Sequence, residues 1–363
     1  MSLLATNFLT PTGREEAWRF TPLNRLAGLH DGSVEVAQRE SLVMKSPATQ
    51  GVSFTRVSRE LLAPESFSDD VIIQRAHAEV LNVAHLSVAA GCEITTPIHL
   101  GRDHHGPAGN ELSRVRISVG ARSHATVVME NSGEAVLGED VEIVLEPGSS
   151  LKFVSLQEWS AKSVHAARHH AIVGKDATFQ SVTVTVGGSL VRLLPTVEFA
   201  GPGASAELLG IYFATAGQHF EHRIHVDHGV PNAKSRVNYK GALAGNEAHT
   251  VWIGDVYIRA AAEGTDTYEL NRNLLLSDGA RADSVPNLEI ETGEIIGAGH
   301  ASTTGRFDDE QLFYLMSRGI AMDEARRLVV RGFFAEIIGN IKDEEIQERL
   351  MSRIDDELLK AGH

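Results

Sequence analysis

The feature that most constrains this fold is a regular spacing of turn glycines between short runs of alternating apolar residues. Between residues 71 and 300 most of these runs are 5 to 9 residues long and rich in Val, Ile and Thr, as in VEIVLE and TVWIGDVYI. Such runs are typical of β-strands. The glycines follow one another at intervals of 13 to 16 residues, with one double interval of 26, at Gly120, Gly133, Gly148, Gly174, Gly187, Gly203 and Gly217. Two intervals make about 27 residues, which fits one coil of a β-solenoid.

Two other all-strand or mixed architectures have to be weighed against the solenoid. No helical pattern lies between the strands, which argues against a sheet built from strand–helix–strand units. An antiparallel meander or sandwich would also place strands every 8–12 residues. The chain has 33 Gly but only 13 Phe, 5 Tyr and 3 Trp, which indicates many tight turns around a core of small and β-branched side chains. The rhythm favours the solenoid and leaves the sandwich as the alternative.

The flanking parts of the chain have a helical character, so we expect three domains. Residues 1–70 form an N-terminal helical domain, 71–305 the β-helix core and 306–363 a C-terminal helical domain. In the first, apolar residues at helical spacing predict a helix over residues 13–29, interrupted at Pro22, and a short helix near residues 58–62. The tail predicts three helices, over residues 308–317, 323–338 and 343–361, with Asp308 and Asp323 as N-caps and Gly319 and Gly339 as stops. These helical ends can cap the open coils of a solenoid or serve as docking surfaces.

Charge and cysteine content exclude several classes of function. The net charge of −15 argues against nucleic acid as the main partner, because phosphate binding needs clustered positive charge. The single cysteine excludes an internal disulfide framework and a metal site built only from this chain's thiolates. The first 20 residues do not resemble a signal peptide, and no segment approaches the roughly 20 apolar residues of a membrane span. We therefore expect a soluble, cytoplasmic protein.

Histidines form three clusters that could in principle bind metal, because imidazole is the commonest metal ligand. Side chains alternate between the two faces of a strand, so the four histidines of the third cluster cannot converge on one ion. We therefore interpret the clusters as a polar, solvated outer face. The lone Cys92 is read as a small buried hydrophobe. The clusters comprise His99, His104 and His105; His165, His169 and His170; and His219, His222, His225 and His228.

Paired carboxylates leave an enzymatic alternative open. Asp278 and Asp283 flank one predicted turn, and Asp266 and Glu269 flank another. Parallel β-helices that cleave acidic polysaccharides use carboxylates on their outer face, so a solenoid carbohydrate-active enzyme is the alternative from another class. The low aromatic content and the helical tail argue against it.

Long motifs in the second half of the chain resemble the SufB/SufD family of iron–sulfur cluster assembly proteins. The motifs are NRNLLLSDGARADSVPNLEI, GHASTTGRFDDEQLFYLMSRGI and AMDEARRLVVRGFFAEII, with GREEAWRFTPL near the N-terminus and QHFEHRIHVDH and VWIGDVYI in the strand region. The resemblance covers most of the chain and is strongest over residues 250–338. It implies a mainly β protein, in which a right-handed parallel β-helix lies between N- and C-terminal helical domains.

Within that family, the resemblance is closer to the SufD branch. SufB proteins carry a persulfide-accepting Cys at the position of Asn271, and they read Glu-His-Glu where this chain has Gly299-His300-Ala301. Many SufD proteins read Cys-Ser-His-Gly, and this chain keeps only the His, with Ala298 in place of the Cys. The resemblance therefore implies His300 as the transferable metal ligand, shared with SufB on a nascent cluster or iron ion.

The resemblance further implies a non-catalytic scaffold subunit of the SufBCD complex. Such a subunit pairs with SufB through the β-helix ends and docks SufC, an ABC-type ATPase, through its C-terminal helices. Alone it holds no cofactor stably, and with SufB it holds a transient iron–sulfur cluster. A closer alternative is a SufD-like homodimeric iron donor. Whether iron binds His300 directly and whether a flavin takes part stay open. We expect Phe313, Tyr314, Arg318, Phe333 and Phe334 to form the docking surface.

Overall fold

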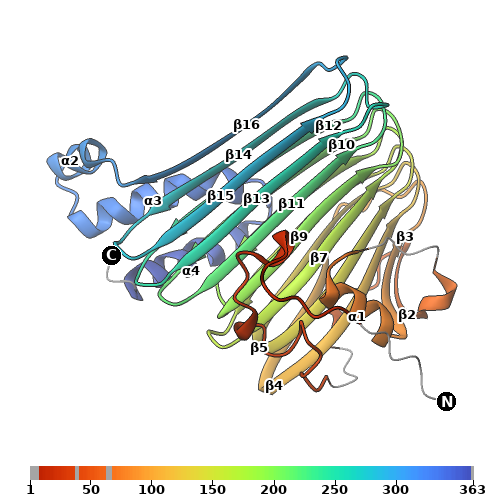
Figure 1. The fold of residues 1–363 in the computed structure, drawn as a ribbon, viewed down its shortest axis with the longest axis horizontal. Coiled ribbons are helices and arrows are strands. Elements are labelled where there is room, and N and C mark those ends of the chain that lie inside the picture. The colour runs from red at the N-terminus through yellow and green to blue at the C-terminus, as the bar shows by residue number, and fades with distance from the viewer. Residues whose placement is uncertain (1–7, 37–40, 63–67, 361–363) are drawn as a thin grey trace.

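A computed structural model describes residues 8–36, 41–62 and 68–360, and it consists mainly of parallel β-structure (Figure 1). Short strands lead into the stack: β1 (Val43–Met44), β2 (Val52–Ser58) and β3 (Asn82–Val88). Two long strands follow, β4 (Ile98–Val119) and β5 (His124–Leu145). The first half of β5 pairs with β6 and the second half with β7, so this strand contributes to both faces of the solenoid.

From β5 onward the strands form two stacks, each made of every second strand. All of these pairs are parallel, which excludes the antiparallel sandwich. Register partners lie 26 to 32 residues apart, as in Val164↔Leu190 and Lys234↔Asp266, so the predicted coil of about 27 residues is confirmed and the later coils are longer. The odd-numbered stack continues with β7 (Val164–Val173), β9 (Leu190–Phe199), β11 (His219–His228), β13 (His249–Ile258) and β15 (Arg281–Ile290). The even-numbered stack contains β6 (Ser150–Trp159), β8 (Thr178–Thr185), β10 (Ser205–Ala214), β12 (Lys234–Leu243), β14 (Asp266–Leu275) and β16 (Gly297–Arg306).

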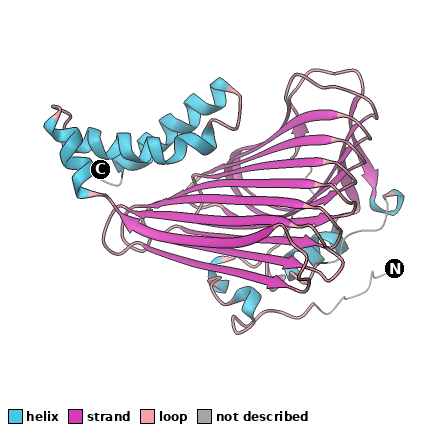
Figure 2. Ribbon diagram, turned by 90° about the horizontal axis from the view of Figure 1, so that it is seen from above, coloured by secondary structure: helices cyan, strands magenta, loops and turns pink. Residues whose placement is uncertain are grey.

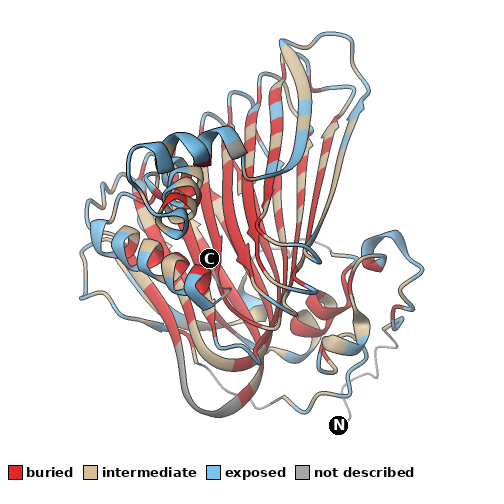
Figure 3. Cartoon of the chain, turned by 90° about the vertical axis from the view of Figure 1, so that its left-hand side faces the viewer, coloured by how far each residue is buried: buried red, intermediate tan, exposed pale blue. Residues whose placement is uncertain are grey.

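Left-handed backbone conformations at the turns explain the glycine rhythm. Gly148, Gly203 and Gly217 have φ between +69° and +74°, a region that glycine enters without the steric cost met by other residues. Between the turns, every second residue points inward and joins a continuous apolar core. Figure 3 shows this core as buried stripes that cross successive strands and fade in the last coil.

The N-terminal part is not the helical domain expected for residues 1–70. The predicted helix over residues 13–29 is replaced by two short 3₁₀ turns, Glu16–Trp18 and Leu23–Arg25. Pro22 separates them, and Gly28 with φ +84° ends the pattern, so the apolar spacing is not sustained as an α-helix. The short helix expected near residues 58–62 is a 3₁₀ turn, Arg59–Leu61. The first α-helix, α1 (Val71–Glu79), begins where we expected the β-helix to start, and Asp70 caps it by accepting hydrogen bonds from the backbone N–H groups of Ile72 and Ile73.

Three helices follow the last strand, as predicted. They are α2 (Asp309–Ser317), α3 (Met322–Ile338) and α4 (Glu344–Lys360). Asp308 caps α2, whereas the N-cap of α3 is Ala321 rather than the predicted Asp323. Apolar residues of α3 and α4 share a core cluster with outward-facing residues of β6, β8, β10 and β12. Both helices therefore cover the outer face of the even-numbered stack (Figures 1 and 2).

The two ends of the solenoid differ. At the N-terminal end β1 and β2 add antiparallel strands to β4 and β3. At the other end β15 pairs only with β13, and β16 only with β14, among the residues that the structure describes. We expected that the helical tail could cap an end, but α3 and α4 lie on a side face. The C-terminal coil therefore presents open strand edges and an uncovered interior.

Candidate functional site

His300 lies at this open end and faces the interior of the solenoid. It is the register partner of Glu269 in β14, which in turn is the partner of Val237 in β12. Val237 belongs to the apolar core, and residues in register on parallel strands share a face, so the His300 imidazole also points inward. Its side chain is nevertheless exposed, because no further coil lies on β16 in the described part of the chain.

Beneath the open end, the interior is polar and hydrogen-bonded. The Asn271 amide donates to the Tyr212 hydroxyl at 3.0 Å, and that hydroxyl donates to Asn273 Oδ1 at 2.7 Å. The Ser284 hydroxyl donates to Asn271 Oδ1 at 2.7 Å, and Asn273 donates to Thr304 Oγ1 at 3.4 Å. Asn271, which stands where SufB proteins have a thiol, is thus a buried member of an amide ladder that ties the last two coils together.

Glu269 differs from these neighbours because its carboxyl group has no partner. The side chain is 1% exposed, and neither Oε1 nor Oε2 has a hydrogen-bond partner among the described residues. Burial, followed by the charge of Asp255, raises the pKa of Glu269 to about 8. The carboxyl group is therefore mostly protonated at neutral pH. The sequence paired it with Asp266, but Asp266 points to the outer face and binds Arg236 at 2.7 Å.

The histidine clusters are not the solvated face that we expected. Alternation within β11 is confirmed: His222 faces inward and stacks on Tyr212 at 5.0 Å, whereas His219 faces outward and contacts His249. Burial lowers the pKa of His222 to about 3 and that of His169 to about 4, so both rings are neutral at neutral pH. Four histidines point into the core and are at most 4% exposed: His165, His169, His222 and His228.

The remaining histidines of these clusters lie on the outer face or outside the described side chains. His170 and His225 face outward and are mostly covered. His99 Nδ1 lies 3.6 Å from Glu130 Oε2. The side chains of His104 and His105 lie outside the described residues, although their backbone belongs to β4. Within the described side chains, no three His, Cys, Asp or Glu residues gather as a metal site.

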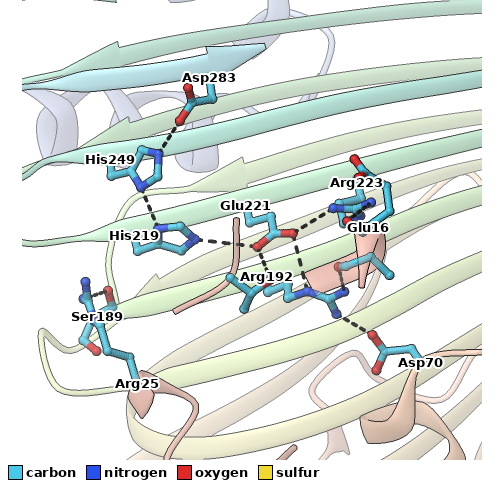
Figure 4. Close-up of polar contacts among 12 residues, drawn as sticks. Glu16, Arg25, Asp70, Ser189, Arg192, His219, Glu221, Arg223, His249 and Asp283 are labelled. Carbon is cyan, nitrogen blue, oxygen red and sulfur yellow. Dashed lines mark hydrogen bonds and ion pairs between the residues drawn. The ribbon is translucent and has the colours of Figure 1, made fainter. Parts of the chain in front are cut away.

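A second polar centre fixes the N-terminal segment on the odd-numbered stack (Figure 4). Arg192 is fully buried; its Nη1 lies 2.5 Å from Asp70 Oδ2 and its Nε lies 3.6 Å from Glu221 Oε1. The Thr21 hydroxyl donates to Glu221 Oε2 at 2.7 Å. Burial raises the pKa of Glu221, but the hydrogen bond from His219 and the charge of Arg192 outweigh it and bring the pKa to about 2. This network was missed in the sequence, where a lone Arg among the apolar residues of LVRLLPTV was the only sign of a covered outer face.

A surface hollow of about 550 Å³ lies beside this network. Its cationic side chains are already engaged. Arg25 donates to the backbone carbonyls of Ser189 and Gly217 at 2.8 and 2.7 Å, and Arg281 pairs with Asp283 at 2.8 Å. His249 donates to or accepts from the same Asp283 at 2.7 Å. These contacts hold turns and neighbouring strands together, which explains the hollow as part of the N-terminal docking.

The predicted docking residues divide into two groups. Phe313 and Tyr314 on α2 are 72% and 58% exposed, and the Arg318 guanidinium lies over the Tyr314 ring at 5.2 Å. Phe334 is completely buried between α3 and the even-numbered stack, and Phe333 packs partly against the same cluster. The assignment of Phe334 to a docking surface is therefore wrong for this arrangement, because a side chain needed for internal packing is not accessible to a partner.

The remaining candidates lie far from the open end or apart from each other. Cys92 follows β3 at the N-terminal end of the stack, and it is partly buried against the core, as expected for a small hydrophobe. Asp278 is exposed and binds Arg306, whereas Asp283 binds His249, so they do not form a pair. None of the helices in the described ranges combines the length and apolarity needed to cross a membrane.

Comparison with known proteins gives a consistent family. The profile of the SUF-system iron–sulfur cluster assembly SufBD core domain matches residues 104–333. An iron–sulfur cluster assembly SufBD family protein of Mycobacterium tuberculosis is 46% identical over 357 residues, which cover 97% of this chain and 90% of that protein. A SufBD family protein of Mycobacterium leprae is 47% identical over 359 residues, with 97% and 91% covered. The iron–sulfur cluster assembly protein SufD of Escherichia coli is 25% identical over 376 residues, with 95% and 88% covered. Together with the parallel β-solenoid, these matches show that the chain belongs to the SufB/SufD family of iron–sulfur cluster assembly proteins.

Proposed function

We propose that this chain is the SufD-type, non-catalytic subunit of a scaffold on which iron–sulfur clusters are assembled. The observation that carries the proposal is the open C-terminal coil, which presents an exposed, inward-facing His300 between the unpaired edges of β15 and β16. A solenoid end of this kind is completed by a partner that covers its interior and pairs with its edges. A SufB-type chain with the same fold can supply both.

His300 is the residue that this chain contributes to the shared site. Its neighbours on β16, Ala298 and Ala301, have no ligand atoms in their side chains. A neutral imidazole is a good ligand for iron, and one imidazole can complete a site whose thiolates belong to another chain. The cluster is the cargo of the complex, so we expect this chain to hold none stably by itself.

The C-terminal helices provide the second docking surface. Helix α2 projects from the end of β16 and carries Phe313 and Tyr314 on its exposed side (Figure 1). Large exposed aromatic side chains on one helix are characteristic of protein interfaces. We propose that this face, with Arg318, binds an ABC-type ATPase, while α3 and α4 fix α2 to the solenoid.

Co-purification tests the proposal directly. The full chain, a SufB-type chain and an ABC-type ATPase are co-expressed, with the tag on this chain, and complexes are separated by size-exclusion chromatography. We expect one complex that contains all three proteins. The double variant Phe313→Ser and Tyr314→Ser should lose the ATPase but keep the SufB-type chain. A chain that forms only homodimers in the presence of both partners would contradict the proposal and favour the homodimeric iron donor.

A further inference from the structure

The orphaned carboxyl group of Glu269 is the strongest unexplained feature outside the contacts described above. Both of its oxygens are buried and lack a partner among the described residues. Leaving a buried polar group without a hydrogen bond costs about 1–3 kcal/mol. Groups of this kind in native proteins need a specific explanation, such as a bound ion.

The solenoid does not need a carboxylate at this position. The same register column contains Leu208 in β10 and Val237 in β12, and both are core residues. An apolar side chain therefore fits the column in the two preceding coils. The change from Val237 to Glu269 occurs one coil below the open end, directly beneath His300. This position links the carboxyl group to the open end rather than to packing.

The surroundings leave room for a ligand beside the carboxyl group. Gly254 faces Glu269 from β13, and a Cβ atom at Gly254 would lie only 2.7 Å from Glu269 Oε1. His300 is on the neighbouring strand in register, and neighbouring strands lie about 4.8 Å apart. Asn271, the next inward residue along β14, already uses its amide for Tyr212 and Ser284. Glu269 and His300 are thus the two uncommitted donor groups of this column.

We propose that Glu269 and His300 together bind a divalent iron ion at the open end of the solenoid. A carboxylate oxygen and an imidazole nitrogen form a ligand pair suited to divalent first-row metals such as Fe²⁺. The inference rests on the proposed role of His300 and adds a second ligand from this chain. Water fills the remaining positions in the isolated chain, and partner ligands fill them in the complex. Binding of a cation also gives the buried carboxylate the counter-charge that it lacks.

Titration of the full-length chain with Co²⁺ under anaerobic conditions tests this inference, because Co²⁺ reports its coordination through visible absorption. We expect one equivalent to bind the wild-type chain. Glu269→Gln keeps the size and polarity of the side chain but removes the anionic oxygen, and it should weaken binding by at least roughly tenfold. His300→Ala should weaken binding to a similar extent. Glu289→Gln is the matched control, because Glu289 lies on the last coil but faces outward, and it should bind as the wild type does.

Two results would overturn the inference. One is the absence of Co²⁺ binding to the wild-type chain, and the other is unchanged binding by Glu269→Gln. Thermal unfolding of each variant serves as the folding control, and Glu269→Leu provides a second ligand-free variant that suits the apolar column. Size-exclusion chromatography of the same proteins with a SufB-type chain separates this inference from the proposed function. A chain that pairs with its partner but does not bind Co²⁺ contradicts only the inference, whereas a chain that fails to pair contradicts the function.

Discussion

Replacement of Arg192 by Met should release the N-terminal segment from the solenoid at a cost that the structure allows us to calculate. The guanidinium neutralises Glu221 and Asp70, donates to the backbone carbonyl of Ala17 at 3.1 Å and lies over the Trp18 ring at 4.1 Å. Met keeps most of the apolar stem but leaves two buried carboxylates without this cation. Breaking a buried ion pair from one side costs about 3–5 kcal/mol.

The pKa of Glu221 gives an independent magnitude. Its folded value of about 2 lies below the ordinary value of 4.5, and this difference corresponds to about 3 kcal/mol of stability at neutral pH. His219 and Thr21 supply part of it and remain in the variant. Asp70 keeps the two backbone N–H groups that it caps. We therefore expect a loss of about 3 kcal/mol, at the lower end of the range for buried pairs.

The dependence on pH follows from the direction of this pKa shift. A carboxyl group with a depressed folded pKa stabilises the protein above its unfolded pKa and loses that contribution as the pH falls toward the folded pKa. The wild type should therefore lose stability between about pH 4.5 and pH 2. Protonation of Glu221 removes its need for Arg192, so the difference between the wild type and Arg192→Met should be largest at pH 7 and should narrow toward pH 3.

Urea unfolding followed by tryptophan fluorescence provides the assay, because Trp18 is buried in the affected contact. The matched control is Arg236→Met, which breaks two 2.7 Å hydrogen bonds to Asp266 at a half-exposed site. Pairs of that kind contribute about 0–1 kcal/mol. The reasoning is refuted if both variants lose the same stability, or if Arg192→Met is equally destabilised at pH 7 and pH 3.

Three further outcomes follow from the burial of individual side chains. Glu269→Leu should raise the free energy of unfolding by about 1–3 kcal/mol, because it removes a buried polar group without a partner among the described residues; a loss of stability in urea would contradict this. Anaerobic iron and sulfide reconstitution of the isolated chain should give no stable cluster, and Cys92→Ser should behave as the wild type does; a cluster lost on that change would make Cys92 a ligand. Phe334→Ala should lower the free energy of unfolding by about 3–5 kcal/mol, whereas Phe313→Ala at an exposed site should change it by less than about 0.5 kcal/mol; equal effects would contradict the division between core and surface.

The solenoid could be predicted because its local signals agree. Turn glycines, strand length and alternating burial repeat with one period, and each coil repeats the pattern of the one before it. The helical tail could be predicted because its caps, Asp308 and Gly319, coincide with the ends of apolar patterns. The N-terminal segment could not, because its apolar residues pack against outer-face residues such as Val164 and Leu190 rather than forming a regular helix.

The chemistry of the interior was harder to predict than the fold. A solenoid core is expected to be apolar, so histidines at inward positions such as His169 and His222 were assigned to solvent. Their burial depends on which phase of the alternation faces inward, and only pairing with neighbouring coils fixes that phase. The same holds for Glu269, whose position becomes apparent when β14 is aligned with Val237 in β12. The sequence did identify His300, through its resemblance to a family motif.

The cluster content of the His300→Ala complex tests the central claim most directly. The chain is co-expressed with a SufB-type chain and an ABC-type ATPase, and the iron and sulfide bound per purified complex are measured under anaerobic conditions. Because His300 is exposed at the open end, we expect an intact complex with little or no cluster. His225→Ala, on the outer face of β11, is the histidine control and should retain the wild-type content. A His300→Ala complex with the wild-type amount of cluster, or a variant that no longer folds or assembles, would contradict the account.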